Sequence, residues 1–261
     1  MMPVTVPVRR LQRGFTLVEL MIAILVGLFL TGGLVMMLQS NRRSFTNQNQ
    51  LSQLQDSERM AMNIITDMVQ IAGYFPDPTT NTALSTMPAI TAPMTLPATQ
   101  YLSGVHAAAA PGDTLTVRFA SQPNDGILNC AGTSNSTAAI QSYINTFFVN
   151  NSQQLVCRMG LGGAAYTDYP LIGEGTANAV IKVTNLQVLY GIDTTGSSNN
   201  VNQYQTADQV TTAGAWNKVI SAQIRLTLSN PLYDATKANN QGQPATVDIT
   251  RTAAVMNQVG L

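Results

Sequence analysis

An apolar run near the N-terminus limits what this chain can fold into more than any other feature. Residues 14–38 read GFTLVELMIAILVGLFLTGGLVMML, and no charged side chain occurs from Leu20 to Asn41. A run of about 20 uncharged residues is long enough for an α-helix to cross the hydrocarbon core of a bilayer. The sequence therefore predicts a membrane-spanning helix. Glu19 lies near its start, where an ionised carboxylate facing lipid would be costly and so needs a partner.

Three basic residues, Arg9, Arg10 and Arg13, precede the run. Secretory signal peptides also begin with a basic segment, but they are cleaved after the apolar part, at small residues. Here the small residues at 32–33 are followed by more apolar sequence. The alternative is cleavage before the run, which leaves the apolar helix in the mature protein.

The hexapeptide at residues 14–19, Gly-Phe-Thr-Leu-Val-Glu, resembles the processing motif of type IV prepilins and of type II secretion pseudopilins. The likeness combines the basic leader, the glycine, the phenylalanine, a glutamate five residues into the mature chain and the uninterrupted apolar span. It implies that prepilin peptidase cleaves on the cytoplasmic side after Gly14 and that the new N-terminal residue, Phe15, is N-methylated. It also implies that Glu19 attracts the charged amino terminus of a neighbouring subunit during assembly.

The helix is predicted to continue beyond the membrane, because no proline occurs between Phe15 and Pro76. Apolar residues recur at spacings of three and four in this second part, with polar residues between them. They are Leu51, Leu54, Ala61, Ile64, Ile65, Met68, Ile71 and Ala72. Gly73 and the following prolines are typical of a helix end. We therefore expect one helix over residues 15–73, with a transmembrane half at residues 15–38 and a second half packed under a distal domain.

Gly27, Gly32 and Gly33 lie inside the membrane half, and each weakens a helix by about 1 kcal/mol relative to alanine. Small residues let helices pack closely in a membrane. The same glycines would also allow the helix to unwind locally when a subunit moves from the bilayer into a filament. Both interpretations remain open at the level of sequence.

The remainder of the chain divides by composition. Residues 1–14 form the leader, and residues 74–112 are rich in Pro, Thr and Ala, with six of the twelve prolines. That composition predicts a surface connection without a core of its own. Residues 113–261 form a β-rich globular domain with period-two patterns. The strands are expected at residues 114–120, 147–149, 154–158, 180–190, 218–228 and 246–255.

Strand pairing in this domain should be antiparallel, because no helical crossover lies between the expected strands. One face of the sheet would then cover the apolar stripe of the long helix. The expected fold class is α+β and type IV pilin-like, with a long N-terminal α-helix packed on a C-terminal antiparallel β-sheet domain.

The chain contains two cysteines, Cys130 and Cys157. If the distal domain lies outside the cytoplasm, a disulfide between them is the default, and a loop of this size contributes about 3 to 4 kcal/mol in the loop-entropy model. The alternative is a pair of buried thiols.

Charge argues against a nucleic-acid binding site. The chain has 13 basic and 13 acidic residues, and three basic ones lie in the leader, so processing leaves 10 against 13, a side-chain balance of −3. Seven basic residues follow Tyr74, which gives no basic patch in the sequence.

Residues that could carry catalysis or bind a ligand are few. His106 is the only histidine, and without a cysteine or carboxylate at ligand spacing it predicts neither a metal site nor a catalytic triad. Residues 160–165 fit GxGxxA, but no helix of sufficient length can follow, so we expect a turn. Asp193 with the turn after it could hold Ca²⁺, although a plain hairpin turn explains the pattern better. Trp216 is interpreted as a core residue in preference to a ligand platform. We expect no cofactor, no metal and no enzyme activity.

The distal domain resembles the PilW-type minor pilins, with a weaker likeness to the J-type pseudopilin of type II secretion. The likeness rests on the cysteine spacing and on residues 147–149, 155–158, 183–193 and 216–228. The end of the chain departs from it, with Met-Asn-Gln at residues 256–258 in place of an expected Arg-Asn pair, which leaves the register of the last strand open.

This resemblance implies a minor pilin that joins a type IV pilus in or near a tip complex, where it would initiate or support assembly and so affect motility, adhesion or DNA uptake. The implied partners are prepilin peptidase, other minor pilins, the major pilin and, before assembly, inner-membrane lipid. The implied location is the bacterial inner membrane, as a single-pass protein with a periplasmic C-terminal domain, and then the pilus at the cell surface. The alternatives are a type II secretion pseudopilin, an anchored envelope enzyme and an adhesin.

Overall fold

The computed structural model describes residues 14–91, 94–162, 166–176, 179–195, 200–234, 236 and 243–258. The leader, apart from Gly14, lies outside these residues. The chain divides into two compact units, Met1–Asn49 and Gln50–Leu261, and each is described by itself below.

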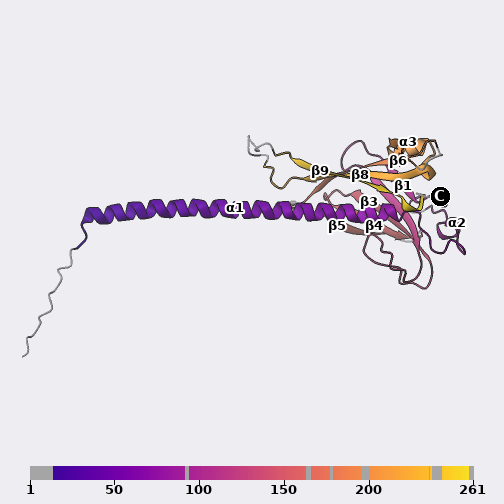
Figure 1. Cartoon of the computed structure of the whole chain (residues 1–261), viewed down its shortest axis with the longest axis horizontal. Helices are drawn as coiled ribbons and strands as arrows, with labels where there is room; N and C mark the ends of the chain where they lie inside the picture. The colour runs from indigo at the N-terminus through magenta and orange to yellow at the C-terminus, as the bar shows by residue number, and fades with distance from the viewer. Residues whose placement is uncertain are drawn as a thin grey trace, which may run out of the picture. The chain divides into compact units, whose positions relative to one another are not determined.

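One long helix, two short helices and nine strands make up the secondary structure of the described residues, with a 3-10 turn before β8 and another after β9 (Figure 1). The helices are α1 (Leu17–Gln70), α2 (Ala83–Thr86) and α3 (Ala207–Thr212). The strands are β1 (Leu102–Val105), β2 (Thr114–Ser121), β3 (Gln141–Val149), β4 (Leu155–Leu161), β5 (Thr167–Ile172), β6 (Val183–Ile192), β7 (Gln203–Gln205), β8 (Val219–Ser229) and β9 (Thr246–Ala254).

The long helix agrees with the sequence prediction. Its distal part buries one face, and the buried residues are Leu54, Ala61, Met62, Ile65, Met68 and Val69. The helix ends where Gly73 adopts a φ of +76° and its N–H donates to the carbonyl of Arg118 at 2.9 Å. A Cβ at this position would lie 3.1 Å from the Tyr101 ring, so glycine meets both the left-handed backbone and the close approach.

The distal domain contains two antiparallel sheets where the sequence predicted one. The first sheet has the order β1-β2-β3-β4-β5 and the second the order β7-β6-β8-β9. The predicted antiparallel pairing is confirmed, for example by Phe147 opposite Cys157 in the first sheet. The last strand pairs with β8 in a continuous register from Ser221 opposite Ala254 to Ser229 opposite Thr246, which settles the register that the sequence left open.

Both sheets and the distal part of α1 contribute to one hydrophobic core. Leu115, Val117 and Phe119 of β2 lie in it together with Leu186, Val188 and Tyr190 of β6 and Ile224, Leu226 and Leu228 of β8. The alternation predicted for residues 218–228 is therefore confirmed. Two stacked surfaces and a helix stripe bury more apolar area than one sheet could, which stabilises the domain.

Two expectations about residues 74–120 are wrong in detail. Strands were expected only from Thr114, but β1 precedes it and pairs with β2. The period-two pattern implies one buried and one exposed face for β2, yet Thr116 and Arg118 on its other face are also buried. The cause is the connection itself: the carbonyl of Pro88 accepts from Arg118 Nη2 at 2.6 Å, and Met94 Sδ accepts from the Thr116 hydroxyl at 3.6 Å. The connection thus covers the outer face of the first sheet.

Besides β1, four short elements escaped the sequence prediction, namely α2, β5, β7 and α3. In the GxGxxA segment, residues 160–161 end β4 and Gly162 begins a turn, while residues 163–165 lie outside the described residues. The strand β5 follows, not a helix, so the context that a dinucleotide site requires is missing at this position.

Candidate functional site

The first turn of α1 positions the residues of the processing motif. Gly14 and Phe15 precede the helix, and the Phe15 side chain is 84% exposed. The N–H of Glu19 donates to the hydroxyl of Thr16 at 3.3 Å, which places Thr16 as the N-cap and Glu19 at the third helical position. The chain after Gly14 therefore forms a capped helix. A side-chain carbon placed on Gly14 would meet no atom of another described residue within 4 Å.

The carboxylate of Glu19 lies in the turn where unpaired backbone N–H groups give the helix its partial positive charge. An acidic group there is stabilised by about 0.3 to 1 kcal/mol when exposed. The side chain is exposed and makes no ion pair with another described residue. It is therefore available to a positive charge from outside the chain.

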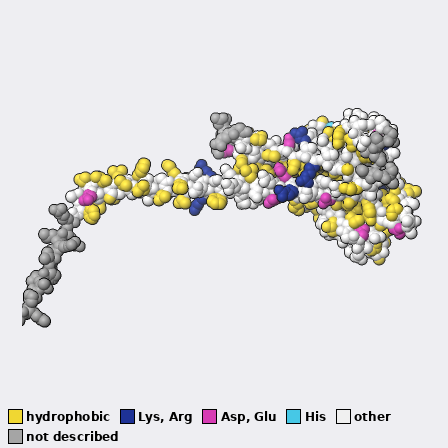
Figure 2. All heavy atoms as spheres, in the orientation of Figure 1, with side chains coloured by type: hydrophobic (Ala, Val, Ile, Leu, Met, Phe, Trp, Pro, Cys, Tyr) yellow, Lys and Arg dark blue, Asp and Glu magenta, His cyan; other side chains and the backbone are white. Residues whose placement is uncertain are grey.

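From residue 20 to residue 38 the helix carries exposed, uncharged and mostly apolar side chains, and Figure 2 shows apolar side chains along its N-terminal part on the face in view. The exposed large apolar residues are Leu17, Val18, Leu20, Met21, Ile22, Ile24, Leu25, Val26, Leu28, Phe29, Leu30, Leu34, Val35, Met36, Met37 and Leu38. Among the described residues, α1 is the one helix whose length and mean hydropathy suit a membrane span. Apolar side chains around a whole helix need an apolar environment. No described residue covers them here, so lipid or other helices must provide it.

Within this helix the polar side chain of Thr31 is satisfied locally. Its hydroxyl donates to the carbonyl of Gly27 at 2.9 Å and lies 3.0 Å from that of Leu28. Such back-bonding removes the need for a solvent partner, which suits a helix in lipid or among other helices. Gly27, Gly32 and Gly33 all lie in continuous helix, and a Cβ on any of them would meet no atom within 4 Å. Their role in a filament stays a prediction.

The two cysteines form a disulfide, Cys130–Cys157, which closes a loop with a sequence separation of 27. Cys157 lies on β4 facing the core, and the N–H of Cys130 donates to Asn145 Oδ1 at 3.2 Å. Both residues are buried. The bond ties the loop before β3 to the first sheet, so it has a structural position and no exposed sulfur.

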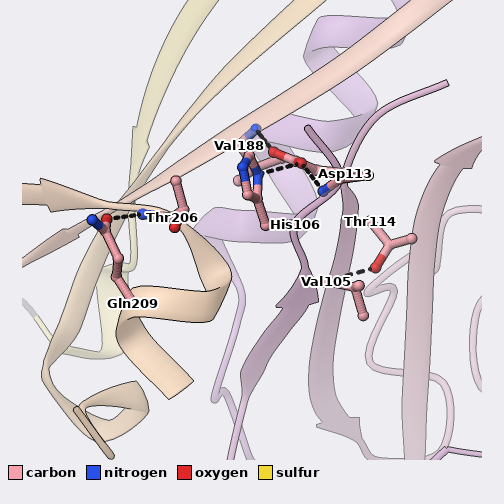
Figure 3. Close-up of polar contacts among 8 residues, drawn as sticks. Val105, His106, Asp113, Thr114, Val188, Thr206 and Gln209 are labelled. Atoms are coloured by element: carbon pink, nitrogen blue, oxygen red, sulfur yellow. Dashed lines mark hydrogen bonds and ion pairs between the residues drawn. The ribbon is translucent and has the colours of Figure 1, made fainter. Parts of the chain in front are cut away.

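The structure brings His106 and Asp113 together in a polar cluster between the loop before β2 and β6 (Figure 3). His106 Nδ1 lies 2.8 Å from Asp113 Oδ1, which also accepts from the N–H of Ala107 at 2.9 Å. Asp113 Oδ2 accepts from the N–H of Val188 on β6 at 2.7 Å. Asp113 is 3% exposed, and its negative charge adds to burial in raising the pKa of the Tyr190 hydroxyl.

This His106 and Asp113 cluster links the loop before β2 to β6, and so links the two sheets. The hydrogen bonds satisfy the carboxylate fully, which is what a buried charge requires. In the described part of the chain, no group of three or more His, Cys, Asp and Glu side chains could hold a metal ion. The arrangement joins the backbone of the loop before β2 to that of β6.

The structure also locates the remaining candidate residues. Asp193 Oδ1 accepts from the N–H and the hydroxyl of Thr195, at 2.8 and 2.6 Å, and the turn at residues 196–199 lies outside the described residues. Trp216 packs edge-on against Tyr190, with ring centroids 4.8 Å apart, but is only partly buried. Sequence reasoning missed Asp113 as the partner of His106, because a spacing of seven residues across a loop carries no local signal.

Two family models match the chain. The model of type IV pilus assembly protein W matches residues 142–257, and the model of the prokaryotic N-terminal methylation motif matches residues 9–35. The first covers β3 to β9 and the second covers the processing motif with the beginning of α1. No curated protein and no solved structure matches the chain.

Proposed function

Because the chain belongs to the prepilin-like proteins of the PilW family, with both the methylation motif and the PilW domain, we propose that it is a minor pilin of a type IV pilus. Prepilin peptidase cleaves it after Gly14 and Phe15 becomes the N-methylated first residue. The mature subunit then enters a complex in or near the pilus tip, with other minor pilins and the major pilin, and initiates or supports assembly.

One observation carries this proposal: apart from Glu19, the side chains of residues 17–38 of α1 are uncharged, mostly apolar and exposed, and this run begins three residues after the proposed cleavage position. Its one other polar side chain besides Glu19, Thr31, is hydrogen-bonded within the helix, and the run buries none of its surface within its own unit. Lipid before assembly and neighbouring helices after assembly would both solvate it. Because lipid is as apolar as the helices, close packing and polar pairing must favour the filament over the bilayer.

Glu19 supplies the polar pairing in this proposal. The amino group of Phe15 in one subunit is positive after cleavage, and the carboxylate of Glu19 in its neighbour is exposed at the first helical turn. Each charge alone is costly in an apolar environment, and together they offset that cost. Cleavage thus creates the positive charge that the carboxylate attracts, so processing comes before assembly.

The proposed domain division follows from these roles. Residues 1–14 are the leader, residues 15–73 carry the long helix with its transmembrane half at 15–38, residues 74–112 are the connection, and residues 113–261 form the globular domain. The globular domain lies in the periplasm before assembly and on the pilus surface afterwards. A buried disulfide in that domain supports an oxidising compartment. The domain has no assigned catalytic role, in keeping with a family of structural proteins.

Mass spectrometry of the mature protein tests the proposal. The full chain, expressed with and without prepilin peptidase, should begin at N-methylphenylalanine 15 in the first case and retain the leader in the second. A mature protein that starts at Met1 in the presence of the peptidase, or that begins after Leu38, would refute it.

The nearest alternative is a type II secretion pseudopilin, which would share the processing step. Detection of the protein in sheared surface filaments favours the pilus. Loss of protein export on deletion of the gene, with surface pili intact, favours the pseudopilus.

A further inference from the structure

An open groove of about 880 Å³ lies in the distal unit where α1 ends. Its volume is within the range of small-molecule binding sites. Aromatic residues and prolines make up much of its lining, together with three side-chain amides and one carboxylate. The residues used below are Tyr74, Phe75, Tyr101, Trp216, Gln100 and Asn217, with Asn257 and Asp77 at the edges.

Segments far apart in sequence build this groove, and hydrogen bonds hold them together. The turn after α1 donates from the N–H of Tyr74 to the carbonyl of Ile71 at 3.0 Å. The side chain of Asn257, after β9, donates to the carbonyl of Ala72 at 3.1 Å. Figure 1 shows α2 and the end of α1 at the same end of the distal unit, and the segment after α2 supplies another wall.

Two of the four aromatic rings are held by hydrogen bonds. Trp216 donates from Nε1 to the hydroxyl of Thr211 at 3.1 Å and rests edge-on against Tyr190. The hydroxyl of Tyr101 donates to the carbonyl of Val219 at 2.9 Å. The Trp216 ring keeps a partly exposed surface on the groove, so part of a rigid aromatic face is open to solvent. Rigid rings bind with little loss of conformational entropy.

Three amide side chains in the lining keep hydrogen-bonding capacity. Gln100 donates from Nε2 to the carbonyl of Leu102 at 2.8 Å, which leaves its Oε1 without a donor among the described residues. Asn257 donates from Nδ2 to the carbonyl of Ala72, and its Oδ1 likewise has no donor among the described residues. Asn217 is exposed, and its side chain bonds to no described residue.

Among the described residues, the groove offers a ligand one negative charge and no positive one. Asp77 is the charged residue of the lining, and its two oxygens accept from the hydroxyls of Thr79 and Thr80, at 2.5 and 2.7 Å. These hydrogen bonds lower the pKa of the Asp77 carboxyl, so it stays ionised and satisfied. No lysine or arginine of the described residues lines the groove. An anionic ligand would find no counter-charge there. A cationic ligand would gain little from Asp77, because this carboxylate is exposed at the edge of the groove, where water screens its charge.

We propose that this groove binds a neutral oligosaccharide. A purely apolar ligand would remove water from the three amides without replacing its hydrogen bonds, which is costly. A sugar satisfies both parts of the lining, because the C–H face of a pyranose ring packs on an aromatic ring and its hydroxyls pair with amides. The proposal goes beyond the assembly role, which uses the apolar N-terminal part of α1 and not this groove.

Trp216 is the only tryptophan in the chain, so its fluorescence reports on the groove directly. The full chain is kept in lauryldimethylamine oxide micelles, since a sugar detergent would itself be a ligand. Maltotriose, cellotriose and triacetylchitotriose are titrated, with sialyllactose as a charged sugar and decaproline as a peptide. We expect saturable quenching or a spectral shift with at least one of the three neutral trisaccharides.

Two variants and two matched controls test the location. Asn217→Ala and Phe75→Ala should each weaken that binding about tenfold, because one removes an amide and the other a ring. Asn151→Ala and Tyr233→Ala remove the same kinds of side chain from exposed positions outside the lining and should leave affinity unchanged. Circular dichroism of all four verifies folding, and Asn217 is exposed enough that its replacement leaves the core intact.

Three outcomes would overturn the proposal. The first is that none of the three neutral trisaccharides changes the fluorescence. The second is that binding occurs but is equally strong in Asn217→Ala and in Asn151→Ala. The third is saturation by decaproline or sialyllactose with no response to the neutral sugars, which would assign the groove to a peptide or to an acidic ligand. The mature N-terminus is measured separately, so failure here leaves the pilin proposal unaffected.

Discussion

The two parts of α1 use apolar residues in opposite ways. Before residue 39 the apolar side chains surround the helix, and Ile24, for example, is 55% exposed. From Leu54 onward they lie on one face in the core, where Ile65 is fully buried. Apolar residues therefore stabilise the fold in the distal part of α1. In the part before residue 39 they contact no core of their own unit. A helix can be continuous in geometry and still belong to two environments.

The largest effect is expected from replacing Glu19, the carboxylate in the part of α1 before residue 39. Glu19→Gln removes the negative charge that we propose to pair with a neighbouring amino terminus, and it should reduce incorporation into filaments by about tenfold or more. Immunoblots of sheared filaments measure this, after mass spectrometry has established that the variant is processed normally.

Glu58→Gln is the matched control, because it makes the same change on the distal part of the helix. It should leave incorporation unchanged. Equal loss in both variants would mean that any carboxylate on α1 matters, and the proposed pairing would then be wrong.

Truncating a buried residue of the distal part should strongly destabilise the distal domain. Ile65→Ala leaves a cavity in the core and should lower the free energy of unfolding by about 3 to 4 kcal/mol. Guanidinium unfolding of the full chain in micelles, followed by Trp216 fluorescence, measures it. Ile24→Ala is the control, since its side chain is in the micelle both before and after the domain unfolds. A similar loss of unfolding free energy in Ile65→Ala and Ile24→Ala would contradict the difference proposed between the two parts of α1.

The disulfide should affect only the distal unit. Replacing both Cys130 and Cys157 by alanine removes the cross-link of a loop with a sequence separation of 27, and should cost about 3 kcal/mol. The same unfolding experiment measures the loss, and the fraction of the variant in the membrane should not change. Unchanged stability, with two free thiols titrated in the unfolded wild-type protein, would instead support the buried-thiol alternative.

Sequence reasoning succeeded where one stretch of chain carries its own signal. The stripe that includes Leu54 and Ile65 and the alternation in residues 218–228 depend only on spacing, so α1 and β8 were both predicted. Arg118 is different, because its burial depends on Pro88, which lies in a segment with no periodic pattern. Two sheets were mistaken for one because period-two spacing identifies the buried face of a strand but not the sheet to which it belongs.

The polar cluster of the candidate site shows the same limit. Asp113 is fixed by His106 nearby but also by Val188, which is 75 residues away. Nothing in the local sequence could indicate that contact, since it arises from the packing of one sheet on the other. The processing motif, in contrast, consists of neighbouring residues and is read directly from them.

The smallest effect concerns pH and the distal part of α1. Burial raises the pKa of the Glu58 carboxyl, and its Oε1 has no hydrogen-bond partner among the described residues. A pKa that is higher in the folded than in the unfolded state means that stability is greatest below the unfolded value of about 4.5 and falls as pH rises through the folded value. Glu58→Gln has no such titration and should be more stable than wild type at pH 7 by a fraction of a kcal/mol, because the carboxyl is only partly buried. The gain should disappear near pH 4, and unfolding curves at pH 4 and pH 7 measure it; a gain that is the same at both values would show that the charge of Glu58 is not its cause.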